Sequence, residues 1–533
     1  MDKGKTIDKN KINTYLGQKG YTIPKNEISI ETQKQIRNDL TIKPVSHGAP
    51  LGGNSQVSFP AYRESSNKFY VPHYYGVENF GAPKEYTIRE GHDIELEFAG
   101  TLRENQEIVV DTYFNHVKKV GFGGGLLELP CAYGKTVLSL NIISRLKKKT
   151  FIIVHKEFLM NQWIERIQQF LPKARIGKIQ GQILDIDDKD IVIGMLQSLS
   201  MKEYPAAIFE SFGLTIIDEV HHISSEVFSN SLFKLVTKYM LGLSATMNRK
   251  DGTTHVFKMF LGDVIFKGKR DEERDVTVRA IEYQVDDDEF NEVKMDYRGN
   301  VAYSTMISKL CEYNRRTEFI LKVVGDMFQE NPSQQIMILA HNKNILKYLH
   351  DAIKHRNIAT VGYYIGGMKE QALKETESKQ VVIATYSMAA EALDIKSLTT
   401  LIMATPKTDI EQSVGRILRE KHSSPIVVDI VDSHSTFKNQ WRKRKTFYRK
   451  ENYKIIYTTS PQYTADTSST GWTVVFNPVS NGCKQISSKK NISVKSNSSS
   501  DKSITNDSDD EEFEDEGPKD KYLTGVCFLK IKK

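Results

Sequence analysis

Two successive series of short apolar runs, each alternating with helical patterns, constrain the fold of this chain more than any other feature. The first series, between about 91 and 270, contains GLLELP, TFIIVH, DIVIGM, LTIIDEV and YMLGLSAT. The second, between about 275 and 458, contains VRAIEYQV, QIMILAH, ATVGYY, QVVIATY, LTTLIMAT and PIVVDIVD. Short β-branched runs joined by helix-length segments are typical of parallel sheets with crossover helices. The sequence therefore predicts an α/β fold with two tandem parallel-sheet lobes.

Composition divides the chain into four zones. Residues 1–90 are rich in lysine and then in aromatics, and we expect a small N-terminal accessory domain there. The two lobes are expected at 91–272 and 273–458, with the charged segment RDEERD (270–275) as the hinge. Residues 459–533 are rich in Ser, Thr and Asn and then acidic, which predicts a low-complexity and mostly disordered tail.

The charge distribution indicates a polyanionic partner. The net charge is +7, but Asp507 to Glu516 holds eight acids and no base, so the rest of the chain carries about +15. A basic body of this kind suits nucleic acid, although the same excess also serves solubility. The four cysteines are far apart, which supports neither a disulfide framework nor a zinc site. No apolar run approaches 18 residues, so we expect no membrane partner and no secretion.

The segment LLELPCAYGKTVLSL predicts a phosphate-binding loop between a strand and a helix. Backbone N–H groups of such a loop point at a phosphate from a helix N-terminus, a position that favours anions. Gly134 would form the turn, Lys135 would reach the β- and γ-phosphates of ATP, and the Thr136 hydroxyl would ligate Mg²⁺. Taken alone, the same letters also fit a strand-to-helix turn with an incidental GKT.

The segment LTIIDEVHHI ends an apolar strand in two carboxylates, Asp218 and Glu219. Carboxylates at the carboxyl end of a parallel strand face the crevice where ligands bind. Asp218 would hold Mg²⁺ through water, and Glu219 would orient and deprotonate the attacking water. A GKT loop followed after roughly 80 residues by this strand favours an ATPase over the chance occurrence of two unrelated motifs.

From about 100 to 450 the motifs resemble superfamily-two DExH helicases of the XPB/UvsW-like branch. TLRENQEIVV resembles the adenine-recognition segment, FIIVHKEFLMNQW motif Ia, VIGMLQSLS the following strand-contacting motif, and IIDEVHHI motif II. LGLSATMNRKDG resembles the SAT motif, VVIATYSMAAEALDI motif V and DIEQSVGRILR motif VI. The resemblance implies two RecA-like lobes and an ATP-driven motor on nucleic acid.

The resemblance also implies roles for residues at the matching positions. It assigns nucleotide binding to Arg103, Gln106 and Asp394. It assigns nucleic-acid contact to Lys156, Gln162, Arg249, Lys250, Thr385 and Met388. It assigns coupling between the lobes to His221, Ser244 and Thr246.

Motif VI has a chemical interpretation of its own. Gln412, Arg416 and Arg419 recur at i, i+4 and i+7, so a helix places them on one face. A guanidinium there could act as an arginine finger on the transferring phosphoryl group. Because these residues belong to the second lobe, catalysis would then require closure of the lobes. For this helix alone, the simpler interpretation is an amphipathic helix whose basic residues face the solvent.

Within this branch the chain is most similar to helicases of large DNA viruses, namely the poxvirus transcript-release type and its iridovirus, asfarvirus and mimivirus relatives. The segments FYVPHYYGVENFG, EVHHISSEVFSNSL and IRNDLTIKPV carry this likeness. It implies DNA in preference to RNA as the substrate, a viral RNA polymerase or replication complex as partner, and a monomer. It also implies a location in the cytoplasmic virus factory or the virion.

Several alternatives stay open at this point. The aromatic segment 59–81 fits either a nucleic-acid-sensing appendage or the core of a small β-rich domain. The basic segment 437–454 fits either nucleic-acid contact or a solvated helix. For the whole chain, an RNA helicase and a non-catalytic scaffold with a motor fold compete with a DNA-directed motor.

Overall fold

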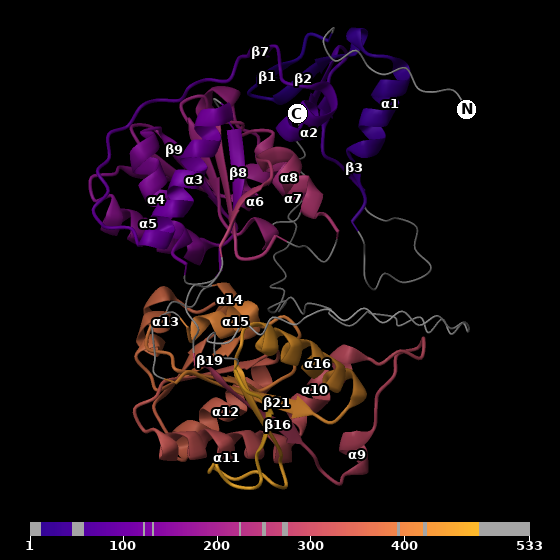
Figure 1. Ribbon diagram of the computed structural model, residues 1–533, viewed down its shortest axis with the longest axis vertical. Coiled ribbons are helices and arrows are strands. Elements are labelled where there is room, and N and C mark those ends of the chain that lie inside the picture. Colours follow the sequence, from indigo (N-terminus) through magenta and orange to yellow (C-terminus); the bar gives the residue numbers. More distant parts are fainter. Residues whose placement is uncertain are drawn as a thin grey trace, which may run out of the picture. The chain divides into compact units, whose positions relative to one another are not determined.

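The computed structural model describes residues 12–44, 58–120, 123–130, 133–222, 225–247, 252–268, 275–391, 395–418 and 424–478. These residues form a five-stranded sheet, two eight-stranded sheets and a two-stranded ladder, with helices between the strands (Figure 1). The predicted hinge, except for Asp275, and the predicted tail beyond 478 lie outside the described residues. Within the described ranges, no helix combines the length and apolarity that crossing a bilayer requires.

A small, mostly antiparallel sheet organises the N-terminal domain. Its order is β5-β6-β2-β1-β7, and a separate ladder joins β3 to β4. The elements are β1 (Tyr15–Gly17), β2 (Gly20–Pro24), α1 (Ile30–Asp39), β3 (Thr41–Ile42), β4 (Phe59–Pro60), β5 (Arg63–Glu64), β6 (Lys68–Val71), α2 (His73–Phe80) and β7 (Glu85–Tyr86). Phe69 and Tyr75 are buried with Tyr21 in one apolar cluster. The aromatic segment 59–81 therefore supplies core side chains, as the β-rich alternative expected.

Tyr74 of α2 connects this domain to the first lobe. Its hydroxyl accepts a hydrogen bond from the Gly124 N–H at 2.7 Å and donates one to the Gly124 carbonyl at 2.9 Å. Its ring packs on Gly262, where an added Cβ would lie 2.7 Å from the ring. Arg63 adds a hydrogen bond to the carbonyl of Asn230 at 3.3 Å. The domain is thus held on the first lobe by directional contacts.

The first lobe contains an eight-stranded sheet with the order β11-β10-β12-β9-β13-β14-β8-β15, parallel except for β11. Its strands are β8 (Gly123–Glu128), β9 (Thr150–Val154), β10 (Ile176–Gln180), β11 (Ile183–Asp185), β12 (Ile191–Met195), β13 (Leu214–Ile217), β14 (Tyr239–Ser244) and β15 (Val264–Lys267). Its helices are α3 (Glu104–Val120), α4 (Lys135–Leu146), α5 (Glu157–Phe170), α6 (Leu196–Met201), α7 (Ser225–Leu232) and α8 (Thr254–Leu261). All five predicted apolar runs form strands of this sheet, and the predicted α/β class is confirmed.

Both faces of the sheet are buried. Phe151 and Ile153 of β9 belong to one apolar cluster, whereas Ile152 and Val154 belong to another. Successive side chains of a strand point to opposite faces, so the two clusters lie on opposite sides of the sheet. Each buried Ile or Val contributes about 1.5–3 kcal/mol by leaving water. Burial on both faces also explains why these strands appear in the sequence as continuous apolar runs.

The second lobe repeats this plan. Its sheet has the order β18-β19-β17-β20-β21-β16-β22-β23 and is parallel except for the pair β22 and β23. The strands are β16 (Thr277–Tyr283), β17 (Ile336–Ala340), β18 (Val361–Tyr364), β19 (Val381–Thr385), β20 (Thr400–Met403), β21 (Ile426–Asp432), β22 (Lys454–Thr459) and β23 (Thr473–Phe476). The helices are α9 (Asp288–Asn291), α10 (Tyr303–Glu312), α11 (Asn314–Glu330), α12 (Lys343–His355), α13 (Glu370–Glu377), α14 (Tyr386–Glu391), α15 (Glu411–Arg416) and α16 (Ser435–Lys450). All six predicted runs are strands here.

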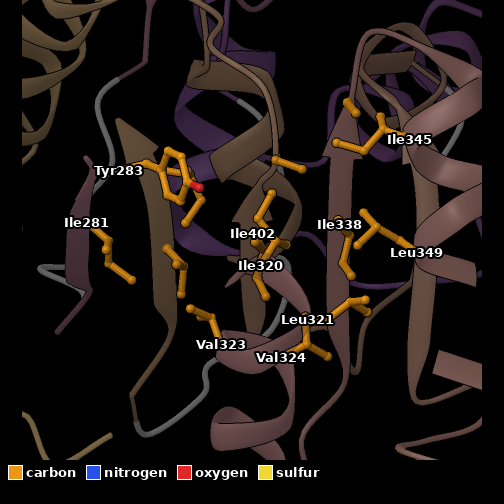
Figure 2. Close-up of a cluster of buried hydrophobic side chains, with 14 of the residues drawn as sticks. Ile281, Tyr283, Ile320, Leu321, Val323, Val324, Ile338, Ile345, Leu349 and Ile402 are labelled. Atoms are coloured by element: carbon orange, nitrogen blue, oxygen red, sulfur yellow. The ribbon is translucent and has the colours of Figure 1, made fainter. Parts of the chain in front are cut away.

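One face of this second sheet is covered by α11 and α12. Figure 2 shows Ile320 and Val324 of α11 and Leu349 of α12 directed toward Ile338 and Ile402 of the central strands. All of these side chains are almost completely buried. The apolar stripe of each helix therefore faces the sheet, as an amphipathic crossover helix requires.

Two ion pairs are buried in the second lobe. Arg316 binds Asp432 through two hydrogen bonds of 2.6 and 2.8 Å. Arg444 of α16 binds Asp429 through two bonds of 2.8 Å. Part of the basic segment 437–454 is thus core, while Arg442 and several other cations of α16 stay exposed.

The second lobe extends further along the chain than predicted. Strand β23 pairs with β22, and Trp472 is buried in the same core as α11. The predicted boundary at 458 therefore leaves one strand of this lobe, β23, outside it. Residues 459–478 were assigned to the tail because they are polar and rich in Ser and Thr, but an edge strand with one exposed face tolerates such residues.

Candidate active site

The predicted phosphate-binding loop joins β8 to α4. Gly134 adopts a left-handed conformation with φ of 89°, and α4 begins at Lys135. This backbone conformation favours glycine, and an added Cβ, 2.3 Å from Nε2 of Gln106, would also displace the Gln106 amide. Thr136, in the first turn of α4, is half-buried. The described part of the loop therefore ends at the start of a helix, a position that favours an anion.

Arg103 and Gln106 lie beside this loop. The Arg103 guanidinium donates to the Tyr133 carbonyl at 2.6 Å, and the Gln106 amide donates to the same oxygen at 2.9 Å. The Arg103 N–H donates in turn to the Gln106 side-chain oxygen at 3.0 Å. The two residues assigned to nucleotide binding by resemblance are thus in contact with each other and with the loop.

Asp218 and Glu219 follow the carboxyl end of β13. Asp218 is 7% exposed, and its Oδ1 accepts a hydrogen bond from the Glu219 N–H at 3.0 Å. Burial raises the pKa of Asp218, and the negative charge of Glu219 acts in the same direction. The charge of Lys135 and a hydrogen bond from Trp163 oppose this rise in the pKa of Asp218. A buried carboxylate in this environment favours a cationic partner.

Lys135 and Glu219 form a direct ion pair. Lys135 Nζ lies 2.6 Å from Glu219 Oε1, and the two side chains are 14% and 21% exposed. Glu219 has φ of 49°, a left-handed conformation that is uncommon for residues other than glycine. The first lobe alone thus brings together the lysine and both carboxylates that were predicted to surround a triphosphate.

His221 connects this cluster to the SAT motif and to the second lobe. Its Nδ1 lies 2.6 Å from Ser244 Oγ and 3.4 Å from Glu219 Oε2. Its Nε2 lies 3.1 Å from the side-chain nitrogen of Gln412 in α15. Because the amide nitrogen of Gln412 is a donor, this arrangement fits a neutral ring whose proton is on Nδ1 and faces Ser244. Ser244 Oγ also accepts from the Thr246 N–H at 3.2 Å.

The remaining predicted residues are placed as follows. Arg416 ends α15, one turn after Gln412, and is 6% exposed. Lys156 precedes α5 and Gln162 lies within it, both half-buried. Thr385 ends β19, buried, with its hydroxyl 3.2 Å from Ser387, and Met388 packs partly against the core of the second lobe. Four predicted residues lie outside the described residues: Arg249, Lys250, Asp394 and Arg419.

Trp163 is a residue of this site that the sequence interpretation missed. It lies in α5 beside the predicted Gln162, is 1% exposed, and its indole N–H donates to Asp218 Oδ2 at 2.9 Å. The buried positions Leu159, Trp163 and Ile167 recur every four residues, so periodicity predicts an inward-facing side chain. Periodicity does not predict which polar group the indole meets.

Known proteins resemble both the first lobe and most of the chain. The family described as "Type III restriction enzyme, res subunit" matches residues 99–249. A protein of Acanthamoeba polyphaga mimivirus, provisionally named an ATP-dependent RNA helicase, is 35% identical over 464 residues, which is 84% of this chain and 87% of that protein.

Two further viral relatives are more distant. A provisionally named helicase of Invertebrate iridescent virus 6 is 26% identical over 68% of this chain and 85% of its own length. A protein of African swine fever virus, also provisionally named an ATP-dependent RNA helicase, is 28% identical over 63% of this chain and 70% of its own length. Together with the 35% identity of the mimivirus protein over most of both chains, these relatives show a family likeness that is not confined to the first lobe.

Proposed function

The chain belongs to the family of these viral helicases and is an ATP-dependent nucleic-acid helicase, and we propose that it is a magnesium-dependent motor that moves along DNA. One observation carries the mechanism. Lys135, Asp218 and Glu219 of the first lobe lie together, and His221 beside them contacts Gln412 of the second lobe. A nucleotide bound at this cluster would therefore contact a series of touching side chains that extends from the first lobe to the second.

The oxygen donors at the site suit Mg²⁺. The Asp218 carboxylate and the Thr136 hydroxyl are hard ligands of the kind that Mg²⁺ binds alongside phosphate oxygens and water. When bound with ATP, the ion neutralises charge on the phosphates. Asp218 and Thr136 would hold it, and Lys135 supplies the fixed positive charge next to them.

Nucleotide binding exchanges the partner of Lys135. Lys135 is held by Glu219, and a triphosphate offers it a stronger anion. The exchange releases the Glu219 carboxylate, which then orients the attacking water and accepts its proton. Glu219 thus acts as a base only when phosphate has taken its place at Lys135. This order limits hydrolysis to the nucleotide-bound state.

Closure of the lobes completes the site. The bond between His221 and Gln412 passes a shift of the first lobe to α15, and Arg416 lies one turn further along that helix. Arg416, together with Arg419, stabilises the charge of the transferring phosphoryl group. Loss of that group after hydrolysis removes the attraction and reopens the lobes.

DNA is the proposed track because the DEVH sequence at motif II and the spacing of Arg103 and Gln106 resemble the DNA-tracking branch. RNA is the second candidate, since the mimivirus and African swine fever virus relatives carry names of RNA helicases. We place the activity in viral transcription or in replication and repair, with a viral RNA polymerase or replication complex as partner. The corresponding location is the cytoplasmic virus factory or the virion.

An ATPase titration tests this proposal. Hydrolysis by the full chain is measured against single-stranded DNA, duplex DNA and RNA, with Lys135→Ala as the matched inactive control. Strand displacement is then compared on DNA, RNA and hybrid duplexes. We expect DNA to stimulate hydrolysis and Lys135→Ala to abolish it. Stimulation by RNA alone would replace the DNA proposal with the RNA alternative, and turnover independent of Lys135 would contradict the assigned site.

A further inference from the structure

Two hydrogen bonds hold the Asp218 carboxylate, one at each oxygen. Trp163 donates its indole N–H to Oδ2 at 2.9 Å, while the Glu219 N–H binds Oδ1 at 3.0 Å. Trp163 and Asp218 are both buried. Because the indole offers a donor and no acceptor, it favours the charged carboxylate in one fixed orientation. The geometry therefore leaves the plane of the carboxylate little freedom.

Trp163 also lies on a helix with contacts on two sides. The face with Leu159, Trp163 and Ile167 is buried against the first lobe. The other side contacts α13 of the second lobe, where Asn161 binds Glu370 at 3.1 Å and Glu165 binds Lys374 at 3.0 Å.

The start of the same helix carries a residue expected to touch nucleic acid. Lys156 immediately precedes α5. A strand bound at Lys156 or a movement of α13 would therefore act on the helix that carries the indole. One hydrogen bond, from the Trp163 indole to Asp218 Oδ2, connects that helix to the carboxylate.

We infer that Trp163 is a positioning residue: its indole N–H orients Asp218 toward the magnesium–nucleotide and transmits movements of α5 to that carboxylate. The inference rests on the proposed function, in which Asp218 holds Mg²⁺. It explains how a helix that faces nucleic acid and the second lobe influences the nucleotide site without touching the nucleotide. A purely structural tryptophan would instead stabilise the lobe and leave the magnesium dependence unchanged.

The first test compares Trp163→Phe with Trp472→Phe. Trp472 is also buried and donates its indole N–H, to the Thr464 carbonyl at 3.0 Å, but it lies at the edge of the second sheet. Binding of a fluorescent ADP analogue is measured with Mg²⁺ and in chelator, after thermal unfolding has shown that each variant folds.

We expect Mg²⁺ to strengthen binding in wild type and in Trp472→Phe. In Trp163→Phe this gain falls about tenfold, the scale typical of residues that orient metal ligands, with affinity in chelator unchanged. An equal gain in folded Trp163→Phe and wild type would overturn the inference. A wild type with no gain from Mg²⁺ would contradict the proposed function itself.

The second test needs no change at Trp163. The chain has three tryptophans, so Trp441→Phe with Trp472→Phe leaves Trp163 as the sole one. We expect its emission to change on addition of Mg²⁺ and ADP, and not with ADP in chelator. Addition of single-stranded DNA should shift it further. Unchanged emission at saturating Mg²⁺ and ADP would overturn the inference even if Trp163→Phe did not fold.

Discussion

Replacing Glu219 with glutamine should separate ATP binding from hydrolysis, and the ion pair with Lys135 sets the expected size of the effect on binding. The two side chains approach to 2.6 Å and are mostly buried. Glutamine keeps an oxygen for Lys135 but loses the charge. A hydrogen bond to a charged group contributes about 1.5–3 kcal/mol. Because Lys135 stays charged, loss of the second charge should move this bond from the upper to the lower part of that range. Detaching Lys135 from glutamine should therefore cost about 1 kcal/mol less, which corresponds to about fivefold tighter ATP binding.

Hydrolysis should respond in the opposite direction. Glutamine cannot accept the proton of the attacking water, and loss of a general base typically lowers turnover by about 10²- to 10⁴-fold. Binding is measured by titration with a fluorescent ATP analogue, and hydrolysis by single-turnover phosphate release, so that product release does not mask the chemical step. The predicted signature is tighter binding together with slower chemistry.

Glu292→Gln provides the matched control. Glu292 also pairs with a lysine, Lys294, at 2.6 Å, but the lysine and glutamate side chains are 45% and 54% exposed. An exposed pair contributes little, so this variant should leave ATP affinity and hydrolysis close to wild type. Weaker ATP binding by folded Glu219→Gln would refute the idea that Glu219 competes with phosphate for Lys135.

Four further outcomes are expected. Arg444→Met removes the charged partner of the buried Asp429, which keeps only the hydrogen bond from Tyr448 at 3.1 Å. The free energy of unfolding in urea should fall by about 3–5 kcal/mol, with much of it recovered in Arg444→Met/Asp429→Leu. A loss under about 1 kcal/mol, the scale of an exposed pair, would contradict this. Burial lowers the pKa of His73 to about 4 from its ordinary value near 6.5. The unfolded state therefore binds the proton first, and unfolding free energy should fall by about 3 kcal/mol as the pH drops from 6.5 to 4, less in His73→Gln. His221→Asn should reduce nucleic-acid stimulation of the ATPase more than nucleotide affinity, and equal losses would argue against its coupling role. Arg419→Ala should likewise slow single-turnover hydrolysis while ATP titrations change little; the reverse pattern would remove it from the catalytic step.

Most of the strands that the sequence predicts are buried on both faces; the edge strand β18, whose residues are mostly half-buried, is the exception. TFIIV and IMILA, which form β9 and β17, are buried at every position, so nothing but a continuous apolar run fits there. Strand β10 alternates half-buried and buried residues, and the edge strand β11 is largely exposed. Such strands depend on pairing with a neighbour and carry little apolar signal of their own. The same holds for β23, which is why the second lobe was predicted to end too early.

The site shows a similar division. Parallel strands end at one edge of a sheet, so Lys135, Asp218 and Glu219 could be expected near one another from the order of β8 and β13 alone. Which side chains pair at that edge depends on packing between segments far apart in the chain. The contact of Lys135 with Glu219 and that of Trp163 with Asp218 span 84 and 55 residues. No local pattern encodes either contact.

The double hydrogen bond between Tyr74 and Gly124 bears on how force passes through the molecule. Gly124 lies in β8, the strand that leads into the phosphate-binding loop. The Tyr74 hydroxyl accepts a hydrogen bond from its N–H and donates one to its carbonyl. These two bonds tie the N-terminal domain to the strand of the phosphate-binding loop, so we expect the domain to move with that strand. A dye placed on the N-terminal domain should therefore report movements of the first lobe in single-molecule recordings.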